Sequence, residues 1–217
     1  MPEPSARLYL ITPVLEDADA FAPRLSEACA AGDVAAVLAR LQAADERTLV
    51  NRIKALAPAV QEAGAALIVS IQGEADLATV AARGGADGVH VSGDPERIRG
   101  LRERLKGDRA IGASGGRTKD EAMSLGEAGV DYLLFGEPRA DGSLPALEAV
   151  AERAAWWAEI FETPCAVYAP TLESVPLLVA TRAEFIALGD ALWTHADGPA
   201  GAIRRLEGQL VQPEASG

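Results

Sequence analysis

The sequence has few of the residues that build disulfide-bonded, zinc-binding or nucleic-acid-binding proteins. Two cysteines, Cys29 and Cys165, lie far apart in 217 residues and form no C-x-x-C pair, so we expect two buried thiols. Aromatic residues make up only 5% of the chain. The formal charge of −12 disfavours binding to nucleic acid and to anionic membranes, because Lys and Arg supply affinity for phosphate.

Long apolar runs and two common signals are also missing. No apolar run approaches the roughly 20 residues that cross a bilayer, and Met1–Ser5 has neither the basic nor the apolar stretch of a signal peptide. We therefore expect a cytoplasmic protein. Thr12-Pro13-Val14 follows the first apolar run where a dinucleotide-binding sheet would carry G-x-G-x-x-G, which counts against that class.

Short apolar runs alternate with amphipathic stretches along the whole chain. The eight runs are Leu8–Thr12, Ala35–Leu41, Ala66–Ser70, Asp87–Val91, Ala110–Ser114, Asp131–Phe135, Cys165–Tyr168 and Glu184–Leu188. The helical stretches between them include Glu46–Glu62, Arg117–Ala128 and Ala146–Ile160. Continuous apolar runs suit strands that are covered on both faces, and strict alternation with helices indicates parallel strands with right-handed crossovers.

This pattern predicts the α/β class and, within it, a (β/α)8 TIM barrel in one domain. We place the single domain at residues 1–217, the barrel at about 7–210 and a flexible tail at 211–217. An open doubly wound sheet is the rival architecture. Short Gly-containing phrases recur before strands, such as Gly-Ala-Asp at 85–87 and Gly-Val-Asp at 129–131, and mark a repeated helix-to-strand joint.

Ligands of such barrels bind at the carboxyl ends of the strands, so the residues that end each run are the candidates for function. Gly115-Gly116-Arg117 suits an anion cradle, or an ordinary turn in which Thr118 and Glu121 form a capping box. His90 is either a core histidine with one hydrogen bond or an acid or base that faces a ligand.

Two carboxylates and one arginine are further candidates. Glu137 and Asp190 follow strands that lie near each other in a barrel, and either form a carboxylate pair or engage local partners, such as Arg139 or a helix start. Arg40 is a candidate anion contact. On the last long helical stretch, Trp156 and Trp157 point about 100° apart, so we expect one to pack inward and the other to be available for a homodimer contact.

Four phrases of the sequence, taken together, resemble a known family. They are Leu8–Thr12 (LYLIT), Gly85–Val91 (GADGVHV), Ile111–Ser114 (IGAS) and Asp131–Gly136 (DYLLFG). Their order and spacing are similar to those of thiamine phosphate synthases and the related TenI thiazole tautomerases, over roughly Arg7–Trp193. The resemblance implies a TIM barrel that joins hydroxymethylpyrimidine pyrophosphate to a thiazole phosphate and releases pyrophosphate with the help of Mg2+ and basic side chains.

Position by position, the resemblance keeps part of the family's site. Arg40 matches a family arginine, Gln42 stands where the family has Lys, and Ser114 matches the family serine. Arg139 follows the sixth strand, but the family's Lys does not follow. Asp94 is the candidate magnesium ligand, and Ser70-Ile71 replaces the Asn-Asp pair that carries a second one.

The family's phosphate-binding end also differs. Tyr168 and Asp190 stand where the family has Gly and Ser at the ends of the seventh and eighth strands. A fixed carboxylate about 4 Å from a phosphate costs from about 1 kcal/mol in water to several in a drier site. The expected catalytic residues are Arg40, His90, Ser114, Glu137 and Asp190, and the expected substrate-binding residues are Arg40, Gln42, Gly115, Gly116, Arg117, Arg139 and Tyr168.

Three functions remain open at this point. The first is a thiamine-phosphate-synthase-like transferase acting on phosphorylated small molecules. The second is a catalytically silent binding or regulatory barrel, favoured by the missing Lys and Asp residues. The third is a repurposed TenI-like enzyme that uses His90, Glu137 or Asp190 on another small ligand.

Overall fold

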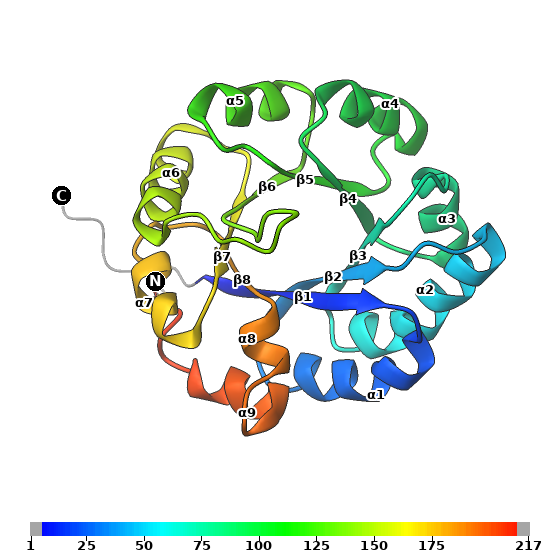
Figure 1. Ribbon diagram of the computed structural model, residues 1–217, viewed down its shortest axis with the longest axis horizontal. Helices are drawn as coiled ribbons and strands as arrows, with labels where there is room; N and C mark the ends of the chain where they lie inside the picture. Colours follow the sequence, from blue (N-terminus) through cyan, green and yellow to red (C-terminus); the bar gives the residue numbers. More distant parts are fainter. Residues whose placement is uncertain (1–5, 212–217) are drawn as a thin grey trace.

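The computed structural model describes residues 6–211 and shows a closed barrel of eight parallel strands in chain order, surrounded by helices (Figure 1). The strands are β1 (Arg7–Leu15), β2 (Val34–Leu41), β3 (Ala66–Ile71), β4 (Gly88–Ser92), β5 (Ala110–Ser114), β6 (Tyr132–Phe135), β7 (Cys165–Ala169) and β8 (Phe185–Leu188). Pairing of β1 with β8 closes the sheet. The predicted TIM barrel is therefore confirmed and the open sheet is wrong, while the tail predicted at 211–217 lies, apart from Val211, outside the described residues.

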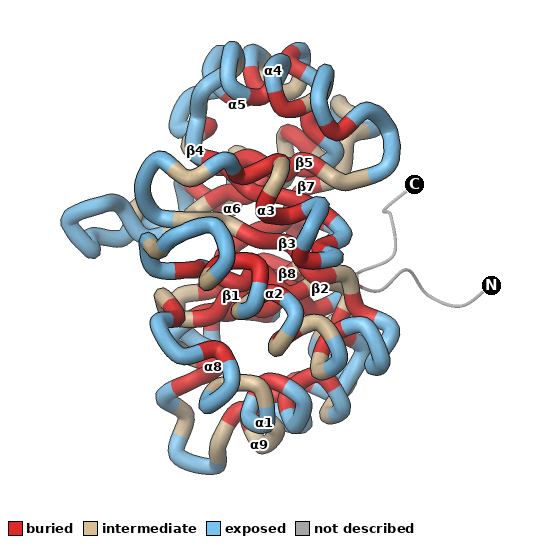
Figure 2. Tube along the Cα trace, turned by 90° about the vertical axis from the view of Figure 1, so that its right-hand side faces the viewer, coloured by how far each residue is buried: buried red, intermediate tan, exposed pale blue. Residues whose placement is uncertain are grey.

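The helices follow the strands as expected and cover the barrel's outer face. They are α1 (Ala18–Cys29), α2 (Glu46–Gln61), α3 (Leu77–Gly84), α4 (Pro95–Leu105), α5 (Lys119–Glu127), α6 (Leu147–Ile160), the short η1 (Leu172–Ser174) and α7 (Val175–Val179), α8 (Asp190–Trp193) and α9 (Gly198–Arg205). Figure 2 shows buried residues in the strands and on the inner faces of the helices, with exposed residues outside. No helix among the described residues is long and apolar enough to cross a membrane.

Local sequence explains where the helices begin. Asp45, Asp76 and Asp94 each accept backbone N–H groups in the first turn of α2, α3 and α4. Thr118 and Glu121 form the predicted capping box of α5. Such side chains satisfy N–H groups that have no partner inside the helix, so each helix starts at a defined residue just beyond a strand end.

The repeated acidic residue at the strand starts has a structural role at the amino-terminal end of the barrel. Asp87 accepts the Leu67 N–H at 2.7 Å, and Asp131 accepts the Ile111 N–H at 2.7 Å. Glu184 does the same for Cys165 N–H at 2.9 Å. Each carboxylate thus ties the strand it precedes to the strand before it, which explains the recurring Gly-x-Asp phrases as joints that set the register of neighbouring strands.

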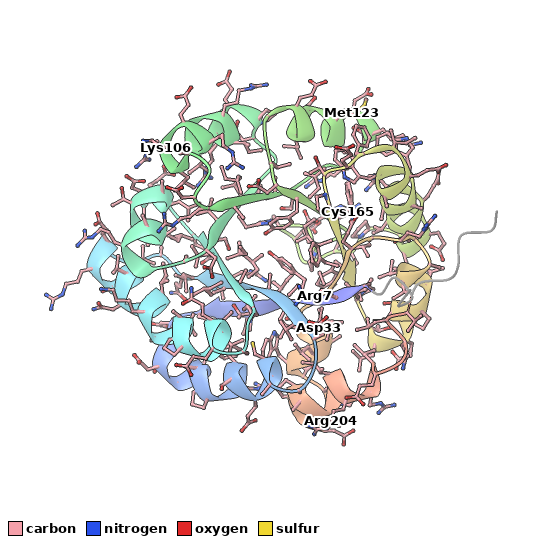
Figure 3. All side chains as sticks on the ribbon, turned by 180° about the vertical axis from the view of Figure 1, so that it is seen from behind. Arg7, Asp33, Lys106, Met123, Cys165 and Arg204 are labelled. Carbon is pink, nitrogen blue, oxygen red and sulfur yellow. The ribbon has the colours of Figure 1, made fainter. Side chains whose placement is uncertain are left out.

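The same end of the barrel carries an ion pair and one of the buried thiols. Seen from behind in Figure 3, Arg7 of β1 lies beside Asp33, whose carboxylate it meets at 2.8 Å. Cys165 begins β7, and both it and Cys29 are buried and free, as the sequence predicts. Burial raises the pKa of Cys29 to about 11, so this thiol stays protonated at neutral pH.

The two tryptophans of α6 differ in environment, as their helical spacing predicts. Trp157 is buried and stacks on Phe161 with ring centroids 4.0 Å apart. Trp156 packs at the edge of the core, and the Lys119 ammonium lies 4.8 Å from its ring centroid. Within the described chain Trp156 is therefore partly covered by α5, and the homodimer contact stays a prediction.

Small residues make room inside the barrel for two tyrosines. Tyr9 and Tyr132 pack with Ile11, Leu38 and Ile68 in a cluster separate from the core beneath the helices. A Cβ atom on Gly112 of β5 would lie 2.0 Å from Tyr132 Cζ, so only glycine allows the ring to cross there. The tyrosine position and the glycine of the neighbouring strand are a matched pair.

Gly112→Ala should therefore destabilise the protein by about 1–3 kcal/mol or more, because the new methyl group collides with the Tyr132 ring in a closely packed interior. Gly100→Ala is the matched control, since its Cβ meets nothing within 4 Å and it lies inside α4, where alanine should stabilise by roughly 0.5–1 kcal/mol. Urea unfolding measures both. Equal stability of the two variants would contradict this account of the interior.

Candidate functional site

One cavity of about 530 Å³ opens at the carboxyl ends of the strands. All eight strands contribute to its lining through residues in the carboxyl-terminal half of the strand or directly after it, which are Thr12, Arg40, Ser70, Ser92, Ser114, Leu134, Tyr168 and Gly189. Residues from distant parts of the chain therefore share one wall, as expected for a TIM barrel. A volume of this size suits a small organic ligand.

The segment between β6 and α6, residues 136–146, lies across this end of the barrel (Figure 1). It contributes Glu137, Pro138, Arg139, Ala140 and Gly142 to the cavity lining. Gly136 starts the segment with a φ of 89°, and a Cβ there would lie 2.6 Å from Val150 of α6. The chain can therefore leave the barrel sharply at Gly136, which brings the following residues over the opening.

Three arginines line the cavity, and they come from three different parts of the fold. Arg40 is the second-to-last residue of β2, Arg97 lies in the first turn of α4, and Arg139 belongs to the segment over the opening. The Arg139 guanidinium donates to Ser143 Oγ at 3.1 Å, which steadies it within that segment. All three side chains are exposed, so they can meet a bound anion without first losing a buried partner.

Sequence reasoning missed Arg97 and Gln72 as cavity residues. Arg97 is the third residue of α4, and the first turn of a helix that follows a barrel strand lies at the same rim as the strand's end. The place of Arg97 three residues into this helix could therefore have identified it from the sequence as a cavity residue. Gln72 follows β3 and its backbone N–H donates to Leu41 at 2.9 Å, so it extends the strand pairing to the rim.

The β7 and β8 ends of the cavity carry a carboxylate and a phenol. Tyr168 is buried, and its pKa is raised by burial and by the charge of Asp190, while the Asp190 N–H and Arg40 act in the opposite direction. A Cβ on Gly189 would lie 2.9 Å from Tyr168 Oη. The phenol therefore lies against the start of α8, where many TIM barrels hold a phosphate group.

The predicted anion cradle after β5 engages carboxylates of the chain itself. Glu121 Oε2 accepts the N–H groups of Arg117 and Thr118, each at 2.9 Å. Glu137 is half-buried and interacts with the Ser114 hydroxyl and the Gly115 N–H. Burial raises the pKa of Glu137, whereas these two donors and the charge of Arg117 oppose the rise.

The residues of the predicted cradle lie outside the cavity lining. Gly115, Gly116 and Arg117 do not line it, and neither does Gln42, whose carbonyl oxygen accepts from Arg52 at 2.7 Å. The structure brings together the other sequence-predicted binding and catalytic residues, which are Arg40, His90, Ser114, Glu137, Arg139, Tyr168 and Asp190.

The residues present do not fit a magnesium site of the kind that the resemblance implies. Asp94 Oδ1 accepts the N–H groups of Glu96 and Arg97, so this carboxylate caps α4 and does not line the cavity. Ser70 and Ile71 supply no carboxylate at the end of β3. Across residues 6–211 no group of three or more His, Cys, Asp or Glu side chains could hold a metal ion.

The floor of the cavity is uncharged. Ile11, Leu38 and Leu134 line it, together with His90 of β4, which is buried apart from its cavity face. His90 Nδ1 lies 3.0 Å from Tyr132 Oη. Burial lowers the pKa of His90 to about 4, so the ring is neutral at physiological pH.

Fold and cavity together define a (β/α)8 barrel with a cavity at the carboxyl ends of its strands that is large enough for a small ligand. Sequence comparison narrows this class, because the family described as thiamine monophosphate synthase matches residues 8–192. The chain belongs to the thiamine monophosphate synthase family.

Individual relatives cover nearly the whole chain. The thiamine-phosphate synthase of Rhodospirillum centenum is 39% identical over 91% of this chain and 94% of its own length. The thiamine-phosphate synthase of Hyphomonas neptunium is 35% identical over 94% of this chain and 93% of its own length. Among solved structures, a thiamine phosphate pyrophosphorylase from Pyrococcus furiosus has a TM-score of 0.74 at 22% identity, covering 94% of this chain and 95% of its own, which supports the fold.

The neutral buried His90 makes stability depend on pH. The unfolded chain takes up a proton on this ring as pH falls from 6.5 to about 4, and the folded chain does not. The contribution is therefore fully present above pH 6.5 and is lost on acidification, by about 3 kcal/mol at about 1.4 kcal/mol per pH unit. An NMR titration of the His90 ring should show a midpoint near 4, and a midpoint near 6.5 in the folded protein would contradict this.

Proposed function

We propose that this protein catalyses the reaction for which its relatives are named, the coupling of hydroxymethylpyrimidine pyrophosphate to a thiazole phosphate in thiamine biosynthesis, in the cytoplasm. The observation that carries the proposal is the meeting of Arg40, Arg97 and Arg139 at one cavity with an uncharged floor. Three guanidinium groups can offset the charge of a pyrophosphate, and the floor suits a flat heterocycle.

The chemistry needs one bond to form and one to break. The ring nitrogen of the thiazole donates its electron pair to the methylene carbon of the pyrimidine and becomes positively charged. The bond from that carbon to the pyrophosphate oxygen breaks, and its electron pair leaves with pyrophosphate. Because negative charge grows on the departing oxygen, the arginines stabilise this state more than the bound substrate.

Arginines also compensate in part for the carboxylate-bound metal that these residues do not provide. A guanidinium stays protonated and binds phosphate oxygens through two N–H groups at once. The segment over the opening, which holds Arg139, covers the reacting atoms and limits the water that reaches them. Binding of the pyrophosphate end should therefore depend on the arginines rather than on Mg2+ held by the protein.

A second candidate function is a binding protein without catalysis, and one observation favours it. Asp190 and the Tyr168 phenol lie at the ends of β8 and β7, where a phosphate on the second substrate would bind. The carboxylate repels that phosphate, so the pyrimidine compound would bind without being consumed. An assay with both substrates separates the two functions, because the binding protein forms no thiamine phosphate above background.

Arg97→Gln should weaken pyrophosphate binding about tenfold and lower the rate of thiamine phosphate formation, because a charged hydrogen bond to the leaving group is lost. Arg99→Gln is the matched control, since it removes the same charge from the same helix but does not line the cavity. Calorimetry with inorganic pyrophosphate and a product assay measure the two effects. Equal losses in both variants would reject the arginine site.

Asp190→Ser should lower the KM for thiazole phosphate about tenfold, because it removes a negative charge from the end of the cavity that the phosphate approaches. Asp108→Ser removes an equal charge from the turn between α4 and β5, at the opposite end of the barrel. Steady-state kinetics of both variants provide the comparison. An unchanged or higher KM in Asp190→Ser would place the phosphate elsewhere.

A further inference from the structure

Three polar side chains form a hydrogen-bonded chain through the apolar interior of the barrel. Tyr9 Oη lies 2.6 Å from Tyr132 Oη, which lies 3.0 Å from His90 Nδ1. Their exposed fractions are 2% for Tyr9, 7% for Tyr132 and 7% for His90. They come from β1, β6 and β4, and the surrounding residues are apolar. A hydrogen bond left unmade in such a place costs about 1–3 kcal/mol.

Counting the protons shows that the hydrogen bonds from Tyr9 through Tyr132 to His90 have one favoured direction of donation. The Tyr132 hydroxyl proton has two acceptors within residues 6–211, His90 Nδ1 and Tyr9 Oη. If it goes to His90 Nδ1, Tyr9 donates to Tyr132 and both hydroxyl protons are paired. If His90 Nδ1 carries a proton and donates to Tyr132 instead, one hydroxyl proton is left buried without an acceptor. The first arrangement is favoured by the cost of that unpaired proton.

The favoured direction decides which nitrogen of His90 carries the ring proton. Nδ1 accepts, so in the neutral ring the proton is on Nε2. Nε2 makes no hydrogen bond within residues 6–211, yet no fully buried side-chain nitrogen or oxygen of this part lacks a partner. Nε2 is therefore open to the cavity that His90 lines.

We propose that Tyr132, supported by Tyr9, holds His90 in the Nε2–H form, so that the cavity floor presents an uncharged donor to a ring nitrogen or carbonyl oxygen of an uncharged heterocycle. Ile11, Leu38 and Leu134 beside it offer apolar surface to the faces of a flat ring. A ring that presented its own N–H at this point would be rejected, because two donors would face each other.

The ligand then has a fixed orientation in the cavity. Its ring lies on the floor against His90, and an anionic group, if it carries one, reaches the arginines at the opening. This inference deepens the proposed function and rests on it for the identity of the ring. Which ring nitrogen of His90 carries the proton in the free protein does not depend on the proposed function. The proton assignment and the proposed function can therefore be disproved separately.

The first experiment is an NMR correlation of the ring nitrogens of His90 with its carbon-bound protons in the ligand-free protein at pH 7. We expect a protonated Nε2 and an unprotonated Nδ1. Tyr132→Phe should give a mixture of both forms, because it removes the group that pairs Nδ1. Tyr9→Phe is the matched control and should keep the wild-type form, because Tyr132 still donates to Nδ1. A protonated Nδ1 in the wild type, or equal effects of the two variants, overturns the assignment.

The second experiment tests recognition with hydroxymethylpyrimidine, which has no phosphate, and its benzene analogue, which has no ring nitrogen. We expect the pyrimidine to bind the wild type, to shift the Nε2–H signal and to bind at least tenfold more tightly than the benzene analogue. His90→Phe should remove that preference and leave inorganic pyrophosphate binding unchanged. No pyrimidine binding, or an unchanged preference in His90→Phe, overturns the recognition. If the wild type did not bind inorganic pyrophosphate, the proposed function would be rejected, but the assignment of the His90 ring proton to Nε2 would still hold.

Discussion

Closure of the sheet is the constraint from which the site follows. Because β1 pairs with β8, the eight strands share one interior and one rim, and side chains that alternate along each strand face either the helices or that interior. The side chain of every second strand residue must therefore fit inside the barrel, whose width is set by the number of strands. Tyr132 crosses this space only because Gly112 has no side chain, and the last inward residues, such as Arg40 and Ser114, converge on one cavity.

The sequence was sufficient for the fold because the signals are local and repeat. Each apolar run is short and continuous, each helix has one apolar face, and acidic residues such as Asp87 and Asp131 mark the joints between them. The bounds of β2 to β8 differ from the predicted runs by at most one residue at either end, whereas β1 extends beyond its run to Leu15, with register shifts against β2. Such extension depends on pairing with another strand, which a local pattern does not contain.

The site was only partly predictable, and the failures have a physical reason. Strand ends identify residues near the rim, so Arg40, His90, Tyr168 and Asp190 were found. The positions of the strand ends do not show which N–H donors already have a hydrogen-bond acceptor within the protein. The glycine turn after β5 looks like an anion cradle in sequence, but Glu121 is held on the first turn of α5 and satisfies its N–H groups before any ligand arrives. Whether a carboxylate of the protein or a ligand anion binds such N–H groups depends on which side chains lie nearby in the folded structure, and the sequence does not show this.

Charge divides the cavity in a way that constrains any ligand. Arginines lie on the β2, α4 and β6 sides of the opening, and the carboxyl groups of Glu137 and Asp190 lie on the β6 and β8 sides. The floor between them carries no charge at neutral pH because His90 is held neutral. A protonated imidazole there would attract the anionic group to the floor and compete with the arginines. Keeping the histidine neutral leaves the opening as the place where a negative group gains most, so the same burial that depresses the pKa of His90 also separates the ring-binding and anion-binding ends of the cavity.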